Sequence, residues 1–264
     1  MAVIVSDDLR LALELADVAD RITLSRFRAE DLIVETKPDL TPVSEADRAV
    51  EQALRDRLAE ARPGDIVFGE EYGGGEASGD GRRWIVDPID GTKGYVRRVP
   101  VWATLLALES AGEITIGVVS APALGRRWWA QRGAGAFTRD TPEGEPRRLH
   151  VSGIRELVDA QLSYGGLDGW RELGRLDALL ELAWRCWRTR GFGDFWSYML
   201  LAEGALEIAL DAEVSLWDVA APMLIVQEAG GRFTDLAGVE TPAGGNAIAT
   251  NGPVHDAARA ILAG

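Results

Sequence analysis

Two short apolar runs in the first third of the chain each end at acidic residues. Ile66–Phe68 is followed closely by Glu70 and Glu71, and Trp84–Val86 leads directly into Asp87. Each run is bounded by turn residues and has the length of a buried strand. We therefore expect a fold built around buried strands with carboxylates at their ends, and this arrangement indicates a functional site there.

The second run opens the segment Asp87-Pro88-Ile89-Asp90-Gly91-Thr92, which concentrates oxygen ligands in one turn. Proline restricts one backbone angle, so the two carboxylates and the Ile89 carbonyl oxygen can converge on one side of the turn. With no cysteine or histidine nearby, this ligand set favours Mg²⁺, with Mn²⁺ as the other candidate, over zinc. The alternative is a capped turn with solvated acidic side chains.

Backbone amides beside this turn provide a place for an anion. If a short helix begins there, the free N–H groups of Gly91 and Thr92 would face an incoming phosphate. Asp218 is expected near the N-terminal end of another helix, where its simplest role is that of a cap. Asp47 likewise falls in the first turn of a helix that Ser44 caps. The segment at Gly91 thus predicts an anion site next to the metal site.

The composition disfavours several classes of function. The 28 basic and 42 acidic residues give a formal charge of -14, which opposes binding to nucleic acid or to an anionic membrane surface. No apolar run is long enough to span a membrane, and the first residues lack the pattern of an export signal. Cys186 is the single cysteine, so no internal disulfide can form. We therefore expect a cytoplasmic protein.

The apolar patterns predict one globular unit of mixed helices and strands. A polar, turn-rich segment at 140–146 is expected to separate an N-terminal α+β half (about 1–145) from a C-terminal α/β half (about 146–264). Helices are predicted over 7–35, from 44 to about 62, and near 170–186, 194–203, 217–229 and 253–262; strands are predicted over 66–68 and 84–86, within 101–137, and over 161–164 and 206–210. Trp84, Trp102 and Trp217 are expected in the core.

Three segments together resemble the motifs of the inositol monophosphatase family. They are Gly69-Glu70-Glu71, the stretch from Trp84 to Thr92, and Trp217-Asp218-Val219-Ala220-Ala221 with Glu228-Ala229-Gly230-Gly231, and they occur in the family's order. The similarity runs over nearly the whole chain, from 42–47 to 249–252. It implies the family's fold, a layered α-β-α-β-α sandwich shared with fructose-1,6-bisphosphatases.

The resemblance also implies an activity and a set of roles. The activity is hydrolysis of a small phosphate ester by in-line attack of a metal-activated water. Family relatives are usually homodimers. The implied metal ligands, for two or three Mg²⁺ ions, are Glu70, Asp87, the carbonyl of Ile89, Asp90 and Asp218. The implied phosphate-binding amides are those of Gly91 and Thr92, with Asp90 and Asp218 also at the substrate, and the residues that orient the water are Thr92 and Asp47, with Glu70 close by.

Two further strings are most similar to the histidinol-phosphate phosphatases of this family. They are Gly125-Arg126-Arg127-Trp128-Trp129-Ala130 and the segment from Trp187 to Tyr198. Histidinol phosphate carries an ammonium group and an imidazole, so its pocket should offer carboxylates or other acceptors. Asp194 is the acid that we expect in that pocket.

Other residues near Asp194 are candidates for contact with the substrate. Arg190 and Gly193 precede it at the start of a predicted helix, although Arg190 could equally be a structural ion-pair partner. Asp211 lies seven residues before Asp218, where the family commonly has a glutamate that contacts the substrate. Either Asp211 or Glu213 could fill that role.

Three functions are compatible with these residues to different degrees. The leading hypothesis is a magnesium-dependent histidinol-phosphate phosphatase of histidine biosynthesis. An inositol-1-phosphate or broad-specificity sugar-phosphate phosphatase would have the same metal motifs, so these motifs do not separate the two. A non-catalytic metal-binding regulatory protein is a remote alternative, because every expected ligand and both members of the Thr92 and Asp47 pair are present.

Overall fold

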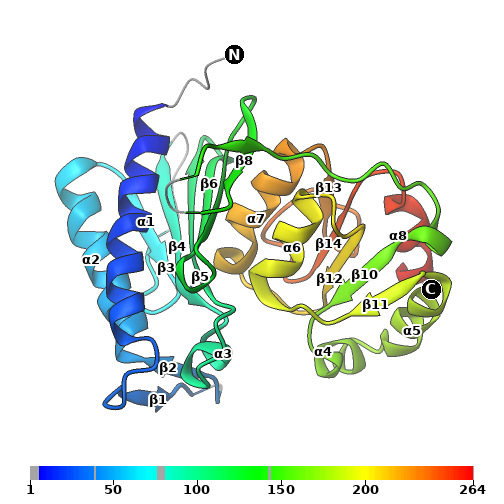
Figure 1. Cartoon of the computed structure of the whole chain (residues 1–264), viewed down its shortest axis with the longest axis horizontal. Helices are drawn as coiled ribbons and strands as arrows, with labels where there is room; N and C mark the ends of the chain where they lie inside the picture. The colour runs from blue at the N-terminus through cyan, green and yellow to red at the C-terminus, as the bar shows by residue number, and fades with distance from the viewer. Residues whose placement is uncertain (1–5, 39, 76–80, 142–143, 264) are drawn as a thin grey trace.

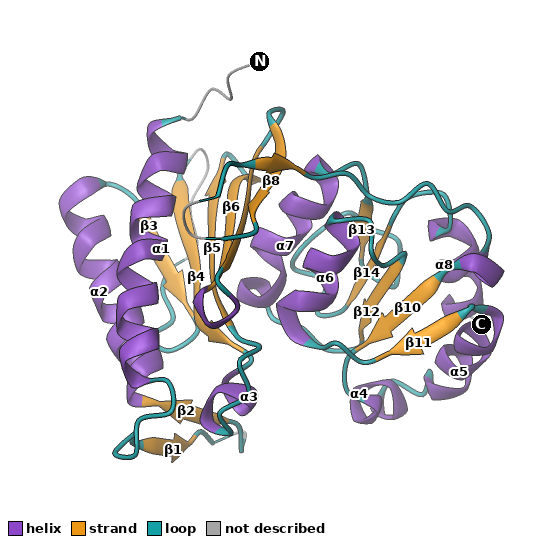
Figure 2. Ribbon diagram, viewed as in Figure 1, coloured by secondary structure: helices purple, strands orange, loops and turns teal. Residues whose placement is uncertain are grey.

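The computed structural model describes residues 6–38, 40–75, 81–141 and 144–263, and in these ranges the elements form five layers (Figures 1 and 2). Helices α1 (Asp7–Arg26) and α2 (Glu45–Ala61) cover the outer face of a seven-stranded sheet. Helices α6 (Asp194–Ala202) and α7 (Leu216–Glu228) lie between this sheet and a five-stranded sheet. Helices α4 (Leu167–Glu172), α5 (Leu176–Arg185) and α8 (His255–Ala263) cover the outer face of the five-stranded sheet. The predicted α-β-α-β-α sandwich is confirmed. The division into halves near residue 145 stays a prediction.

Both large sheets mix parallel and antiparallel pairs. The first has the order β3 (Ile66–Gly69), β4 (Arg82–Asp90), β5 (Ala103–Ser110), β6 (Glu113–Ala121), β7 (Arg126–Gln131), β8 (Gly135–Arg139) and β9 (Arg147–Arg148), and only β3 and β4 are parallel. The second has the order β11 (Arg188–Arg190), β10 (Gln161–Tyr164), β12 (Ile208–Asp211), β14 (Ala247–Thr250) and β13 (Arg232–Thr234). A short ribbon pairs β1 (Val34–Thr36) with β2 (Pro42–Ser44).

Strand β5 shows why this part of the sequence is an unbroken apolar run. Leu105 and Ala107 face the central core with α6 and α7, whereas Leu106 and Leu108 face the outer core under α1 and α2. Successive side chains of a strand point to opposite faces, so a strand that is buried on both faces needs apolar residues at every position. The strands that carry the acidic residues are thereby buried in the middle of the fold.

Two predicted helices were wrong in extent. The helix predicted over 7–35 ends at Arg26, because Phe27 turns away to pack on Tyr95 and Trp102 and Arg28 adopts a positive φ of 67°. The helix predicted near 170–186 is two helices, α4 and α5, which the turn at Gly174 separates. Glycine is a poor helix former and commonly ends a helix.

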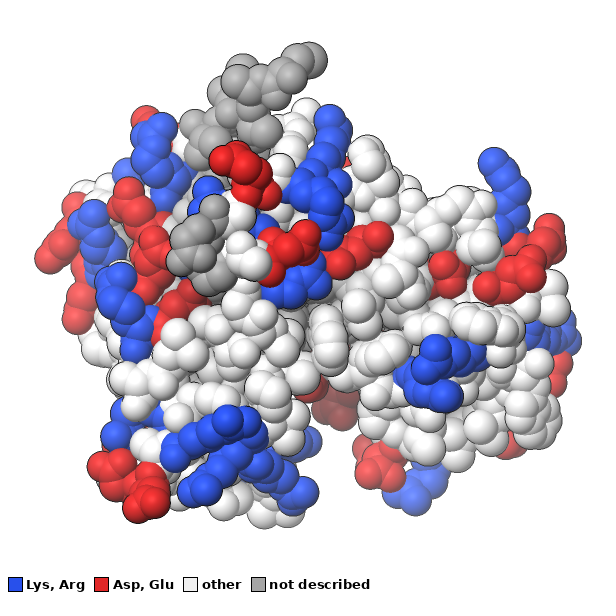
Figure 3. Space-filling view, in the orientation of Figure 1, with Lys and Arg blue, Asp and Glu red and all other residues white. Residues whose placement is uncertain are grey.

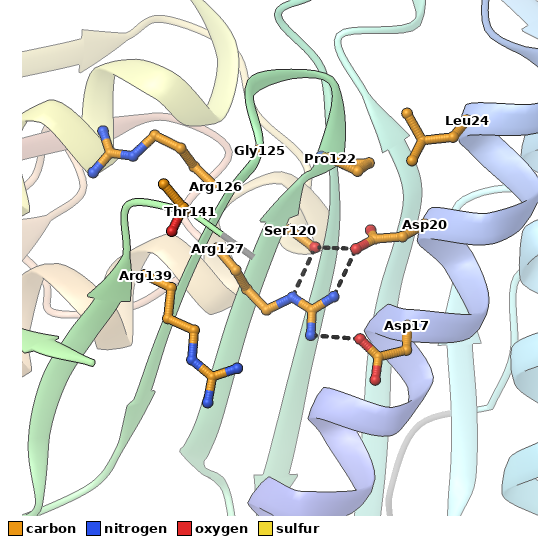
Figure 4. Close-up of a pocket in the computed structure, with 10 residues that line it drawn as sticks. All are labelled: Asp17, Asp20, Leu24, Ser120, Pro122, Gly125, Arg126, Arg127, Arg139 and Thr141. Carbon is orange, nitrogen blue, oxygen red and sulfur yellow. Dashed lines mark hydrogen bonds and ion pairs between the residues drawn. The ribbon is translucent and has the colours of Figure 1, made fainter. Parts of the chain in front are cut away.

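Arg127 ties α1 to the seven-stranded sheet (Figure 4). Its guanidinium lies 2.8 Å from Asp17 and 2.6 Å from Asp20, and its Nε donates to Ser120 at 2.9 Å. The Ser120 hydroxyl in turn donates to Asp20. These side chains line a cavity of about 290 Å³ between α1 and strands β6 and β7. The string 125–130, which resembles histidinol-phosphate phosphatases, therefore includes a residue that holds the fold together.

We expect Arg127→Met to lower the free energy of unfolding by on the order of 2 kcal/mol, because the change leaves Asp20 buried without its cation while it keeps an apolar stem. Urea denaturation would measure the change. Arg139→Met is the matched control, since Arg139 lines the same cavity but forms no ion pair with a described residue. A loss in the control as large as that in Arg127→Met would contradict a specific role for Arg127.

Charged side chains of both signs lie on the surface (Figure 3), in keeping with the 28 basic and 42 acidic residues of the chain. Acidic and basic side chains are intermixed over α1 and α2 on the face shown in Figure 3. Within the described ranges, no helix is both long and apolar enough to cross a membrane.

Candidate active site

An acidic cleft of about 390 Å³ opens at the ends of β3 and β4, beside the N-termini of α3 (Thr92–Val96), α6 and α7. Carboxylates dominate its wall. Its acidic lining residues are Glu70, Asp87, Asp90, Asp194, Glu213 and Asp218, and the other predicted site residues in the wall are Ile89, Gly91 and Thr92. Lys93 is the one cation among the described lining residues. The structure thus brings together residues that are widely separated in the sequence.

Glu70 lies in a turn that a buried carboxylate holds in place. Glu51 of α2 is fully buried and accepts hydrogen bonds from the backbone N–H groups of Glu71 (2.7 Å) and Tyr72 (3.2 Å). The ammonium group of Lys37 lies 2.7 Å from both Glu70 and Glu71. The Glu70 side chain is therefore directed to the cleft from a backbone that is fixed at several points.

Asp87 and Asp90 lie in the last part of β4 rather than in the predicted turn, because the strand continues to Asp90 with a shift of register against β5 between the two residues. Asp87 is 1% exposed, and its Oδ1 has no hydrogen-bond partner among the described residues. Asp90 Oδ2 accepts a hydrogen bond of 2.6 Å from the N–H of Phe195, which is the second residue of α6. The Pro88 carbonyl accepts a hydrogen bond from Thr104 of β5. The seven-stranded sheet and α6 therefore orient this end of β4 jointly.

Asp218 is the third residue of α7, and it forms a capping box with Ser215. The Ser215 N–H donates to Asp218 Oδ2 at 2.7 Å, as the predicted cap requires. Carboxylate oxygens of Asp87, Asp90 and Asp218 lie within 4.8 Å of one another. One oxygen of Asp218 thus fixes the side chain while the carboxylate also faces the cluster.

Thr92 and Asp47, which the resemblance pairs as residues that orient the water, lie within hydrogen-bonding distance of each other. The Thr92 hydroxyl lies 3.1 Å from Asp47 Oδ1 and 2.7 Å from the Ile89 carbonyl oxygen, so it can donate to either. Asp47 Oδ2 accepts from both the N–H and the hydroxyl of Ser44. Burial raises the pKa of Asp47, and the hydrogen bonds from Ser44 oppose that rise.

The backbone at Gly91, where the sequence predicted an anion site, is closely packed against Val101 and Asp194. Its φ of 83° lies in the left-handed region, and a Cβ there would be 3.1 Å from the Val101 carbonyl oxygen and 3.3 Å from Asp194 Oδ2. Glycine is therefore the residue that fits. Thr92 begins α3, so its N–H belongs to a free helix start. Asp194, with a φ of 48°, borders this point from the first turn of α6.

The carboxylates repel one another strongly. Burial raises the pKa of Asp87 well above its usual range, and repulsion from Glu70, Asp90 and Asp218 adds to the effect. Burial also raises the pKa of Asp218 to about 6. An all-oxygen ligand set with an unpartnered buried oxygen fits a hard divalent cation such as Mg²⁺. The residues present therefore match the predicted metal, and they explain why the cleft needs one.

A second cavity, of about 540 Å³, adjoins the cleft and shares Lys93, Asp194 and Glu213 with it. Gly193 and Asp211 also line this cavity. Burial raises the pKa of Asp211 to about 7, and a hydrogen bond from Tyr198 opposes the rise. Four glycines also line this cavity, Gly165, Gly166, Gly169 and Gly191. This cavity can hold the organic part of a molecule whose phosphate lies in the cleft.

Comparisons with known proteins identify the fold and the motifs. A model of the inositol monophosphatase family matches residues 5–263. This chain belongs to the inositol monophosphatase family. It is 56% identical over 255 residues to a protein of Streptomyces coelicolor named histidinol-phosphatase, across 95% of this chain and 94% of that protein. It is also 56% identical over 250 residues to the histidinol-phosphatase of Mycobacterium tuberculosis, across 95% of each.

More distant relatives share the fold of the family. An inositol-1-monophosphatase of Mesorhizobium japonicum is 35% identical over 216 residues, across 79% of this chain and 77% of that protein. The crystal structure of the extragenic suppressor protein SuhB from Bartonella henselae matches with a TM-score of 0.86 and 31% identity, covering 97% of this chain and 98% of that chain. The family resemblance read from the three motifs is confirmed.

Some features of this family member were not predicted from its sequence. Lys37 and Lys93 were not among the expected site residues. Lys93 directly follows the motif at 87–92, which could have indicated it, whereas no local motif marks Lys37, which reaches Glu70 and Glu71 through folding. Trp217 was expected in the core, but it is only partly buried and lines the cleft, where its ring packs on Phe68 at 5.6 Å between ring centroids. Its position at the start of α7 brings it to the cleft with Asp218.

The structure places the predicted site residue Arg190 outside both cavities. It is exposed at the end of β11, it lines neither cavity, and its guanidinium donates to the carbonyl of Thr189. It forms no ion pair within the described part of the chain, so neither of its two predicted roles is visible. A contact between Arg190 and the substrate stays a prediction.

Proposed function

We propose that this protein is a magnesium-dependent phosphatase that hydrolyses L-histidinol phosphate to L-histidinol and phosphate, a step of histidine biosynthesis. The observation that carries the proposal is the junction of two cavities: an acidic cleft beside free helix-start amides, and an adjoining cavity lined by further carboxylates. The names of the relatives at 56% identity support the same substrate.

The metal ligands that we propose are Glu70, Asp87, the carbonyl of Ile89, Asp90 and Asp218. The cleft has six lining carboxylates and one lysine, so a phosphate dianion would be repelled by the protein alone. Bound Mg²⁺ ions, of which we propose two or three with Mn²⁺ as a substitute, supply the opposing positive charge and favour ionisation of water near neutral pH. Gly91 and Thr92 would direct their N–H groups to the phosphate oxygens.

The Thr92 and Asp47 pair would accept a proton from the attacking water. When the Thr92 hydroxyl donates to Asp47 Oδ1, its oxygen can accept a hydrogen bond from a water molecule in the cleft, so a proton of the water would pass to Thr92 as the Thr92 proton passes to Asp47. That water oxygen forms a bond to phosphorus while the bond to the ester oxygen breaks in line with it. The departing alkoxide takes a proton from solvent, because no described histidine lines the cleft.

The second cavity would recognise the cationic end of the substrate. Asp194 lies next to the Gly91 backbone and lines both cavities, as Glu213 does, and Asp211 lines the second cavity alone. An ammonium group or a protonated imidazole gains from ionised acceptors, whereas the hydroxyls of an inositol ring gain less. These carboxylates favour histidinol phosphate over inositol 1-phosphate, which is the second candidate substrate.

Purified protein with Mg²⁺ tests the proposal directly. We expect kcat/KM for histidinol phosphate to exceed by at least about tenfold the values for inositol 1-phosphate, fructose 1,6-bisphosphate and adenosine 3′,5′-bisphosphate, a difference of about 1.4 kcal/mol. Chelation of Mg²⁺ should abolish phosphate release. A clear preference for inositol 1-phosphate would refute the assignment, and phosphate release that survives chelation would refute the metal dependence.

We expect Asp194→Asn to reduce kcat/KM for histidinol phosphate about tenfold more than kcat/KM for p-nitrophenyl phosphate, because the change removes a negative charge that faces the cationic group. Asparagine tolerates the positive φ at this position, so the backbone should persist. Steady-state kinetics with both esters measures the effect. Asp177→Asn, which changes another first-turn aspartate far from the cavities, is the control. Equal losses for the two esters would assign Asp194 a structural role.

We also propose a cytoplasmic homodimer. Trp184 and Trp187 are 79% and 67% exposed. Trp184 lies in the last turn of α5, and Trp187 directly precedes β11, which is an edge strand of its sheet. Exposed aromatic side chains beside an unpaired strand edge are typical of an interface. Sedimentation velocity of the protein and of a Trp184→Ser/Trp187→Ser variant would test this. A monomeric parent protein, or a variant that dimerises as well as the parent, would contradict it.

A further inference from the structure

Tyr198 of α6 points a buried hydroxyl at the wall of the second cavity. Its side chain is 2% exposed, and its ring packs on Phe233 with 5.9 Å between centroids. Its hydroxyl donates to Asp211 Oδ2 at 2.5 Å. A buried tyrosine hydroxyl needs an acceptor, and a bond this short to a carboxylate is a strong one. The packed ring therefore holds one oxygen of Asp211 in a set position.

The other oxygen of Asp211 occupies space that a missing side chain leaves open. A Cβ at Gly165, just after β10, would lie 2.0 Å from Asp211 Oδ1. Any residue other than glycine at 165 would displace the carboxylate or the loop. Gly165 and Asp211 both line the second cavity. Two independent features, a hydrogen bond on one side and an absent side chain on the other, thus determine where the Asp211 carboxylate lies.

We propose that Tyr198 is a positioning residue for substrate selectivity: together with Gly165 it holds the Asp211 carboxylate at the cavity wall, where Asp211 contacts the cationic end of the phosphate ester. This inference rests on the proposed function, because it requires a substrate with a positively charged organic part. Tyr198 lines neither cavity, and its hydroxyl acts through Asp211. The hydrogen bond also favours the ionised form of the carboxylate, which is the form that attracts a cation.

The decisive experiment is a double-mutant cycle of Tyr198→Phe and Asp211→Asn with histidinol phosphate and p-nitrophenyl phosphate as substrates. We expect Tyr198→Phe to raise KM for histidinol phosphate about tenfold with kcat changed less than about twofold, and to change kcat/KM for p-nitrophenyl phosphate less than about twofold. In the Asp211→Asn background, Tyr198→Phe should change KM no further. Additive effects of the two changes, or equal losses with both esters, would overturn the proposal.

A control separates positioning from general stability. Tyr95→Phe also removes a buried tyrosine hydroxyl, one that donates to the Thr23 carbonyl outside both cavities. We expect it to lower the melting temperature without changing the ratio of kcat/KM between the two esters. A change of that ratio as large as in Tyr198→Phe would overturn the proposal. If the unaltered protein shows no preference for histidinol phosphate in the four-substrate comparison, the proposed function itself fails, which is a separate result.

Discussion

Asp87→Asn is expected to lower kcat/KM for histidinol phosphate by at least about a thousandfold while the protein remains folded. Asp87 is buried, its Oδ1 has no described partner, and it lies among Asp90 and Asp218. The amide keeps the shape of the side chain but removes one negative charge from the proposed ligand set. Phosphate release and far-ultraviolet circular dichroism would measure activity and folding separately.

The same variant should be more stable than the parent protein when no metal is bound. Burial and repulsion from neighbouring carboxylates oppose the charge on Asp87, so its removal relieves a cost in the folded state. Added Mg²⁺ should raise the melting temperature of the parent protein more than that of Asp87→Asn, because a ligand stabilises the state that binds it. Near-normal turnover, or an equal response of both proteins to Mg²⁺, would contradict the proposed metal site.

Thr92→Ala is expected to reduce kcat by about a hundredfold or more, with little change in KM. The substitution keeps the backbone N–H that we assign to phosphate but removes the hydroxyl that lies 3.1 Å from Asp47. Thr92→Ser should retain most of the activity, because serine offers the same hydroxyl. Single-turnover phosphate release would report the chemical step.

The partner of Thr92 gives a further check. Asp47→Asn should cost about as much as Thr92→Ala, and the double variant should lose no more than either single one, because residues that act as a unit are not additive. Thermal denaturation serves as the control, since Asp47 also caps α2 with Ser44. Full additivity, or an inactive Thr92→Ser variant, would show that the pair does not share one proton path.

Much of the site could be predicted because its parts are local. The segment 87–92 carries proposed ligands and a helix start within six residues, and Asp47 and Asp218 lie in the first turns of helices, as the sequence predicted. Such patterns depend on backbone geometry over a few residues. The family motifs therefore indicated the layered fold and the metal chemistry before any long-range contact was considered.

Other features depended on packing between distant segments. The N–H of Phe195 reaches Asp90 across 105 residues, and Tyr198 meets Asp211 only because α6 packs beside β12. Likewise, Trp217 lines the cleft although its apolar character predicted the core, and Arg190 lies outside both cavities. The two overlong helices have different causes: tertiary contacts of Phe27 accompany the end of the first, whereas the second is interrupted by a local turn at Gly174.

The sequence by itself determined the family, the oxygen-ligand motif at 87–92 and the helix starts that contain Asp47 and Asp218, because these depend on residue types at a few neighbouring positions. Only the tertiary structure decided that a second acidic cavity adjoins the cleft and that Tyr198 meets Asp211 at its wall. The physical reason is the central layer: α6 and α7 are buried between two sheets, and their packing places helix N-termini against the ends of strands that the sequence pattern alone cannot align.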